Sequence, residues 1–125
     1  MPTVLIVDDE PIVRNMARLA LSGDGYRVLD ATGAAEAAAL CQNIGGEQID
    51  LLIVDHGLTP DNGRVIAENI MKFWPATKVL IISGSALNTV QDEDGIPPGS
   101  SFLQKPFTPQ QLLSVVQNFL FPSTQ

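Results

Sequence analysis

The stretch that decides the fold reads Gln48-Ile49-Asp50-Leu51-Leu52-Ile53-Val54-Asp55-His56-Gly57. Its centre, residues 51–54, consists only of Leu, Ile and Val and is too short for a helix. Such a run is typical of a strand that is buried on both faces of a parallel sheet. The run ends at Asp55, and parallel α/β sheets bind ligands outside the carboxyl ends of their strands. Asp55 is therefore predicted to lie at the centre of a binding site.

Three further short runs are followed by polar side chains in the same way. These side chains are, in chain order, Asp8 and Asp9, Ser83, and Lys105. Because the carboxyl ends of parallel strands meet at one edge of a sheet, we expect all of them to lie near Asp55. The sequence thus predicts three acids, a hydroxyl and an amine at one edge.

Segments with helical spacing separate the short runs. The predicted strands are 1–7, 26–31, 51–54, 78–82 and 102–104, and the predicted helices are 8–22, 33–43, 63–73 and 109–120. This alternation predicts an α/β fold with a five-stranded parallel sheet and helices on both faces. A fourth helix, with a weak signal at 86–91, is expected to be short or irregular because Gly and Pro follow it.

Some helix details follow from the pattern of residues. The acids of the segment 8–10 suit the first turn of a helix, and Thr108 suits the cap of the last one. Phe73 is expected to face inward with Ile66 and Ile70. Cys41 is expected to lie on an inner helix face as an inert core residue.

The composition limits the class of protein. A chain of 125 residues fits one domain, for which we expect bounds of 1–121 and a tail at 122–125. Hydrophobic residues make up 45% and charged residues 17%, as in globular proteins. The net charge of −7 argues against a nucleic-acid partner. No apolar run approaches the ~18 residues of a membrane helix, and there is no signal peptide, so a cytoplasmic location is expected.

The acidic cluster indicates a metal site. Three carboxylates within ~4–5 Å of one another repel by on the order of 3–4 kcal/mol per pair. A hard divalent cation such as Mg²⁺ relieves this repulsion, and one or two carboxylates and a carbonyl suffice to hold it. Lys105 and Ser83 would then suit the oxygens of an anion. A metal, a lysine and a hydroxyl around one carboxylate are typical of phosphoryl transfer, with Asp55 as the nucleophile.

The sequence resembles a response-regulator receiver domain of two-component signalling, the CheY-like family, over essentially its whole length. The residues that carry the resemblance are Val7-Asp8-Asp9-Glu10-Pro11, Asp55 with Gly63 eight residues on, Ile82-Ser83-Gly84, and Phe102-Leu103-Gln104-Lys105-Pro106-Phe107. The resemblance implies a flavodoxin-like fold with strand order 2-1-3-4-5. The last motif also resembles receivers at the C-terminal ends of hybrid sensor histidine kinases.

The resemblance implies roles for the site residues. Asp9 would be the main ligand of Mg²⁺ or Mn²⁺, and Asp8 would assist. Asp55 would be both a metal ligand and the phosphoacceptor, and Gly57 would offer its backbone carbonyl. Lys105 would bind the phosphoryl group and precede a cis peptide bond to Pro106.

The resemblance also implies how the domain switches and signals. Ser83 would be the switch hydroxyl and Phe102 the switch aromatic. The partners would be a sensor histidine kinase or a histidine phosphotransfer domain, and an adjoining kinase domain is possible in a longer chain. We expect such a partner to dock on the first helix, around Ile12, Met16 and Leu19. A tight homodimer on phosphorylation, through the face of the fourth helix, fifth strand and last helix, is not expected because the fourth helix is predicted to be irregular and acidic residues follow it.

The sequence departs from the family in the loop after Asp55, where Leu58 and Thr59 replace the usual Met-Pro and the proline is Pro60. Two alternatives stay open at this point. A haloacid-dehalogenase-like phosphatase uses similar groups, but its nucleophile lies in an Asp-x-Asp motif on the first strand, where this chain has Asp-Asp-Glu. A pseudo-receiver would bind partners without being phosphorylated. Whether it is a phosphorylatable receiver or a pseudo-receiver, we expect the chain to be a signalling domain and not an enzyme acting on a separate substrate.

Overall fold

A parallel five-stranded sheet forms the centre of the molecule in the computed structural model, which describes residues 2–43, 48–57, 63–84 and 99–122. The strands are β1 (Thr3–Val7), β2 (Arg27–Ala31), β3 (Leu51–Asp55), β4 (Lys78–Ser83) and β5 (Ser101–Gln104). Their spatial order is β2-β1-β3-β4-β5, which confirms the predicted flavodoxin-like topology. Every residue of β3 is buried, as its unbroken apolar run predicts.

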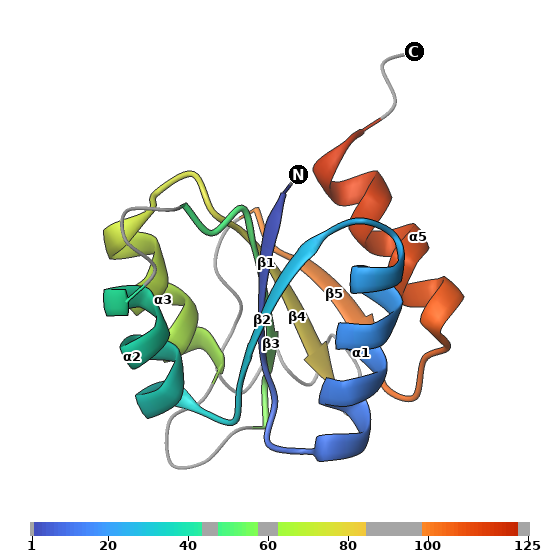
Figure 1. Cartoon of the computed structure of the whole chain (residues 1–125), viewed down its shortest axis with the longest axis horizontal. Coiled ribbons are helices and arrows are strands. Elements are labelled where there is room, and N and C mark those ends of the chain that lie inside the picture. The colour runs from blue at the N-terminus through green and yellow to red at the C-terminus, as the bar shows by residue number, and fades with distance from the viewer. Residues whose placement is uncertain (1, 44–47, 58–62, 85–98, 123–125) are drawn as a thin grey trace.

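Helices cover both faces of the sheet (Figure 1). They are α1 (Pro11–Gly23), α2 (Ala34–Asn43), α3 (Gly63–Phe73) and α5 (Pro109–Leu120). Figure 1 shows α1 and α5 on one face and α2 and α3 on the other. The weak helix predicted at 86–91 lies outside the described residues, as do the loop positions 58–60 and the end of the tail, 123–125.

Alternate residues of the strands supply two cores. Leu5, Val7, Leu52 and Val54 pack on the side of α2 and α3. Their sequence neighbours pack on the side of α1 and α5, and they are Val4, Ile6, Leu51 and Ile53. The side chains of a strand alternate between faces, so a strand in the middle of three layers must be apolar throughout. Polar residues are therefore tolerated only where a strand ends.

The first helix begins later than predicted. It starts at Pro11, and its first turn contains no acid, because Glu10 is the N-cap and has an extended backbone (φ −86°, ψ 112°). The carboxylate of Asp8 accepts a hydrogen bond from the backbone N–H of Glu10 at 2.8 Å, which holds these acids in the turn before the helix. At the other end, Gly25 has a φ of +92°, a conformation that favours glycine and ends the helix.

Two further predictions about helices have opposite outcomes. Thr108 caps α5 as predicted, in a capping box with Gln111. Phe73 was expected to face inward, but this is wrong, because its side chain is 65% exposed. Phe73 is the last residue of α3 and its ring tilts against Trp74, with centroids 5.8 Å apart. The thiol of Cys41 is half-buried beside the core, and burial raises its pKa.

Candidate functional site

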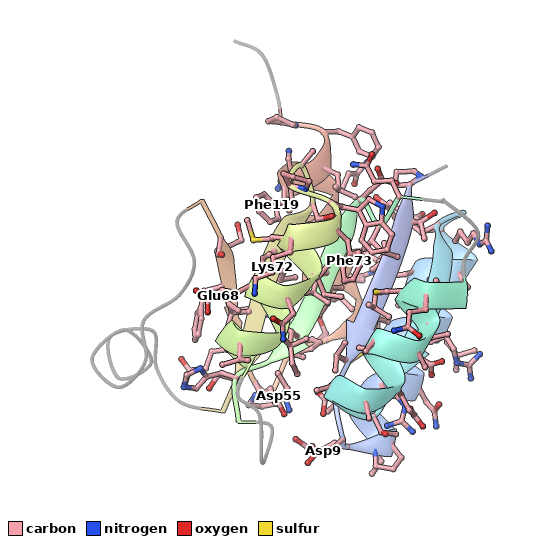
Figure 2. The ribbon with its side chains drawn as sticks, turned by 90° about the vertical axis from the view of Figure 1, so that its left-hand side faces the viewer. Asp9, Asp55, Glu68, Lys72, Phe73 and Phe119 are labelled. Carbon is pink, nitrogen blue, oxygen red and sulfur yellow. The ribbon has the colours of Figure 1, made fainter. Side chains whose placement is uncertain are left out.

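The acids of the first and third strands meet at the carboxyl edge of the sheet. Asp8 and Asp9 follow β1, and Asp55 ends β3, which is hydrogen-bonded to β1. One carboxylate oxygen from each of the three residues lies within 4.8 Å of the others. Figure 2 shows Asp9 and Asp55 at this end of the molecule. The structure therefore brings together the three acids that the sequence singled out.

Asp8 is the least solvated of these acids, with an exposure of 0%. Its Oδ1 accepts the Glu10 N–H, whereas Oδ2 has no hydrogen-bond partner, although it lies 3.2 Å from Lys105 Nζ. The contact with Lys105 is thus an ion pair without hydrogen-bond geometry. Burial, and then repulsion from Asp55, raise the pKa of Asp8, while the Glu10 N–H and Lys105 oppose that rise. A buried carboxylate oxygen without a donor is suited to a cation.

Asp55 is also buried, and each of its carboxylate oxygens has a separate partner. Oδ1 accepts the backbone N–H of Gly57 at 3.0 Å, and Oδ2 accepts from Lys105 Nζ at 3.1 Å. The backbone N–H of His56 donates to the carbonyl of Ile82 at 2.8 Å, so the chain just after Asp55 stays attached to β4. The carboxylate is therefore held in a fixed position at the end of a central strand.

Lys105 directly follows β5 and contacts the acids of the first and third strands. Its Nζ lies 2.6 Å from Glu10 Oε1, 3.1 Å from Asp55 Oδ2 and 3.2 Å from Asp8 Oδ2. Burial alone lowers the pKa of Lys105, but the hydrogen bond to Glu10 and the charges of Asp55 and Asp8 outweigh burial and raise it above its ordinary value. The Lys105–Pro106 peptide bond is cis, which confirms the prediction.

Ser83 and Phe102 lie on the two neighbouring strands. Ser83 ends β4 with an exposure of 3%, and its carbonyl accepts the backbone N–H of Lys105 at 2.7 Å. Strand pairing places Ile82, its neighbour, opposite Asp55. Phe102 is half-buried on β5 and packs against the core on the side of α2 and α3. Ser83 therefore lies at the edge that carries Asp55, while Phe102 lies within the neighbouring strand, three residues before Lys105.

Two residues near the site were not singled out from the sequence. Glu10 contacts Lys105, and its only signal was its place in the Asp-Asp-Glu motif. Arg14 lies one helical turn further on. Its Nη1 donates to the backbone carbonyl of Asp8 at 2.8 Å, and its Nε lies 3.5 Å from Asp30 Oδ2. Arg14 thus supports the turn that carries the acids.

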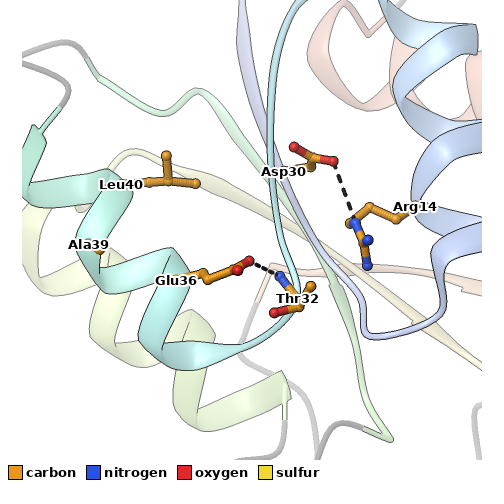
Figure 3. A pocket seen from close by; sticks show the side chains of 6 residues that line it. All are labelled: Arg14, Asp30, Thr32, Glu36, Ala39 and Leu40. Carbon is orange, nitrogen blue, oxygen red and sulfur yellow. Dashed lines mark hydrogen bonds and ion pairs between the residues drawn. The ribbon is translucent and has the colours of Figure 1, made fainter.

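An open hollow of about 480 Å³ lies beside this support (Figure 3). Arg14 and Asp30 form an ion pair at one side of it, with Nε 3.5 Å from Oδ2, and elsewhere in its lining the backbone N–H of Thr32 donates to Glu36 Oε1 at 2.7 Å. That hydrogen bond lowers the pKa of Glu36. The polar groups of the hollow therefore bind one another.

Comparison with known proteins agrees with this geometry. The family described as response regulator receiver domain matches residues 4–117, and the chain belongs to that family. In solved structures, the chain is similar to the chemotaxis response regulator CheY4 of Vibrio cholerae, with a TM-score of 0.83 at 27% identity, covering 96% of this chain and 99% of that one. It is also similar to the receiver domain of the hybrid histidine kinase CckA, with a TM-score of 0.74 at 31% identity, covering 94% and 98%.

Curated relatives are longer than this chain. The sensor kinase CckA of Brucella abortus is 31% identical over 94% of this chain, which spans only 12% of that protein. The aerobic respiration control protein ArcA of Escherichia coli K12 is 31% identical over 95% of this chain, which spans 48% of it. The family is thus shared by a kinase and by a control protein. Among the helices that the structure describes, none is long and apolar enough to cross a membrane.

Proposed function

We propose that this chain is a phosphorylatable receiver domain, with Asp55 as the phosphoacceptor. The proposal rests on the groups around Asp55. Lys105 Nζ lies 3.1 Å from Asp55 Oδ2, and one oxygen each of Asp8 and Asp9 lies within 4.8 Å of an Asp55 carboxylate oxygen. A nucleophile for phosphoryl transfer needs cationic groups that neutralise the transferred oxygens. Lys105 supplies one such group from the chain itself.

The second cationic group would be Mg²⁺ or Mn²⁺. The donor set fits a hard cation, because it consists of oxygens only and includes the unpartnered Asp8 Oδ2. Asp9, Asp8 and Asp55 would hold the ion with the backbone carbonyl of Gly57. Once bound, the ion would neutralise negative charge that builds up on the phosphoryl oxygens.

The residues of the chain then have separate roles in phosphoryl transfer. An Oδ of Asp55 attacks the phosphorus of a phosphohistidine, an O–P bond forms, the N–P bond breaks, and the electron pair stays on the histidine nitrogen. Lys105 Nζ exchanges its contact with Asp55 for one with a phosphoryl oxygen. The Ser83 hydroxyl donates to another phosphoryl oxygen, and Phe102 repacks behind it. Later attack of water on phosphorus restores the Asp55 carboxylate and releases phosphate.

The partners that we propose are a sensor histidine kinase or a histidine phosphotransfer domain. The chain would signal through its phosphorylated state and catalyse only its own phosphorylation and dephosphorylation. Membership of the receiver family and the position of Asp55 on the third strand argue against the phosphatase alternative. The full set of acids and Lys105 argues against a pseudo-receiver. We also propose domain bounds of 1–121.

The test is the intact mass of the protein after incubation with acetyl phosphate and Mg²⁺. We expect a gain of one phosphoryl group in the wild type and none in Asp55→Asn. Asp24→Asn is the matched control, because Asp24 is an exposed aspartate at the far end of α1, and it should gain the phosphoryl group normally. An adduct of undiminished yield in Asp55→Asn would refute Asp55 as the acceptor.

A further inference from the structure

Lys105 has an acidic partner that the proposed chemistry does not use. Glu10 Oε1 lies 2.6 Å from Nζ, closer than Asp55 or Asp8, and the Glu10 side chain is 56% exposed. The side chains of the other two acids are 9% and 0% exposed. The ammonium of Lys105 is therefore shared between an outer carboxylate and two inner ones.

The two inner carboxylates are also those proposed to hold Mg²⁺. Lys105 contacts Asp55 Oδ2 and Asp8 Oδ2, so the ammonium and a metal ion would compete for these two carboxylates. A lysine ammonium has three donors and no fixed direction, so it moves toward whichever acids are available. An outer acid that binds the ammonium leaves the inner oxygens more available to the metal.

Glu10 is well placed to act as this outer acid. Its backbone N–H donates to Asp8 Oδ1, and its carbonyl accepts the N–H of Arg14 as the first bond of α1. The main chain at Glu10 is therefore fixed relative to the metal-binding turn. The Glu10 carboxylate therefore reaches Lys105 from a fixed point of the main chain.

We propose that Glu10 is a positioning residue that competes with Asp8 and Asp55 for the Lys105 ammonium, so that these two inner carboxylates bind Mg²⁺ more strongly. This inference rests on the proposed function. When the phosphoryl group arrives, Lys105 turns to it and Glu10 returns to solvent. The Glu10 side chain is 56% exposed, so water can replace its contact with Lys105 at little cost.

The experiment is a calorimetric titration with Mg²⁺ alone, at one pH and ionic strength, of the wild type, Glu10→Gln and Asp24→Asn. We expect Mg²⁺ to bind Glu10→Gln about three- to tenfold more weakly than the wild type. Asp24→Asn removes the same charge from the far end of a 13-residue helix and should leave the affinity unchanged. Far-UV circular dichroism verifies that each variant is folded.

A double-mutant cycle separates positioning from simple charge. If Glu10 acts through Lys105, then Glu10→Gln should have no effect on Mg²⁺ affinity in a Lys105→Met background. Lys105→Gln provides a second background if Lys105→Met does not fold. A weakening that persists without Lys105 would overturn the inference, because it would show a direct effect of the Glu10 charge.

The outcomes also separate this inference from the proposed function. Equal Mg²⁺ affinity in the wild type and Glu10→Gln would overturn the positioning role and leave the receiver function intact. A wild type that binds no Mg²⁺ would overturn both the metal site and the role of Glu10. The mass experiment on Asp55 is independent of the Glu10 result, because it compares the wild type with Asp55→Asn.

Discussion

Lys105 Nζ lies 3.1 Å from Asp55 Oδ2, although the two residues are 50 positions apart in the chain. The contact exists because β3 and β5 both run into the same edge of the sheet, with only β4 between them. Without a metal ion, this ammonium is the cation in contact with both Asp8 and Asp55. The folded state therefore tolerates an excess of negative charge at the proposed phosphorylation site.

Asp8→Asn should stabilise the metal-free protein by about 1–2 kcal/mol, as is common when a strained functional group is removed. The folded state raises the pKa of Asp8 above 3.8, so ionised Asp8 disfavours folding at pH 7. This penalty is absent below pH 3.8, where the residue is protonated in both states, and so the gain should vanish there. Urea unfolding of both proteins at pH 7 and pH 3 measures the difference in their free energies of unfolding. A loss of stability at pH 7 would contradict the prediction.

Added Mg²⁺ should reverse the ranking of these two proteins. A ligand that binds only the folded state stabilises it, and the effect grows with ligand concentration. The wild type should therefore gain thermal stability with Mg²⁺, while Asp8→Asn gains less. The control is Mg²⁺-free buffer brought to the same ionic strength with a monovalent salt, because salt alone also screens the repulsion.

Lys105→Met should destabilise the metal-free protein by about 3 kcal/mol, the low end for breaking a buried ion pair, because Glu10 is exposed. The folded state raises the pKa of Lys105 above 10.5. Its contribution to stability is therefore complete below pH 10.5 and is lost as the pH rises through the folded value. The difference from the wild type should be constant between pH 7 and 9 and shrink above pH 10.5. A difference that already shrinks between pH 7 and 9 would argue against this account.

Thr108→Ala should lower the free energy of unfolding by about 1 kcal/mol, because it removes the capping box of α5. Ser114→Ala, at an exposed position within the same helix, is the control and should change stability by less than about 0.5 kcal/mol. Denaturant unfolding measures both variants. Equal effects of the two changes would show that the capping box contributes nothing measurable.

Ile12→Glu should slow transfer from a phosphorylated histidine phosphotransfer domain by about tenfold, equivalent to about 1.4 kcal/mol. Ile12 is 84% exposed on α1, three residues after Asp9, where we expect the donor to dock. Labelling by acetyl phosphate, which needs no docking surface, should be unchanged. Val65→Glu on α3 is the matched control, because this residue is also exposed but lies on the other face of the sheet. Slower labelling by acetyl phosphate in Ile12→Glu would point to a damaged site instead.

The sheet and the group around Asp55 could be predicted because both follow from short patterns. Unbroken apolar runs mark strands covered on both faces, and parallel strands present their last residues to one edge. Asp8 and Asp55 each follow such a run, and Lys105 follows the short stretch Ser101-Phe102-Leu103-Gln104, which was enough to place the three together. The order of the strands came from the family resemblance and was confirmed.

Side-chain direction at the ends of helices was less predictable. Phe73 has the spacing of an inward residue, but at the last position of α3 it turns to solvent beside Trp74. Glu10 was assigned to a helix, and only its extended N-cap backbone brings its carboxylate to Lys105. Both residues lie at a helix end, where the apolar spacing of a helix does not determine the direction of a side chain.

The two outer strands of the sheet limit how the domain associates with others. β2 carries Arg27 and Asp30 along an edge of five residues, and β5 offers only four residues, with Ser101 and Gln104 at its ends. Short edges with charged or polar side chains are poor templates for a further strand. Backbone pairing between copies, the route to fibrous aggregates, is thereby discouraged even at high protein concentration. The helix surfaces are left as the better places for a partner to bind.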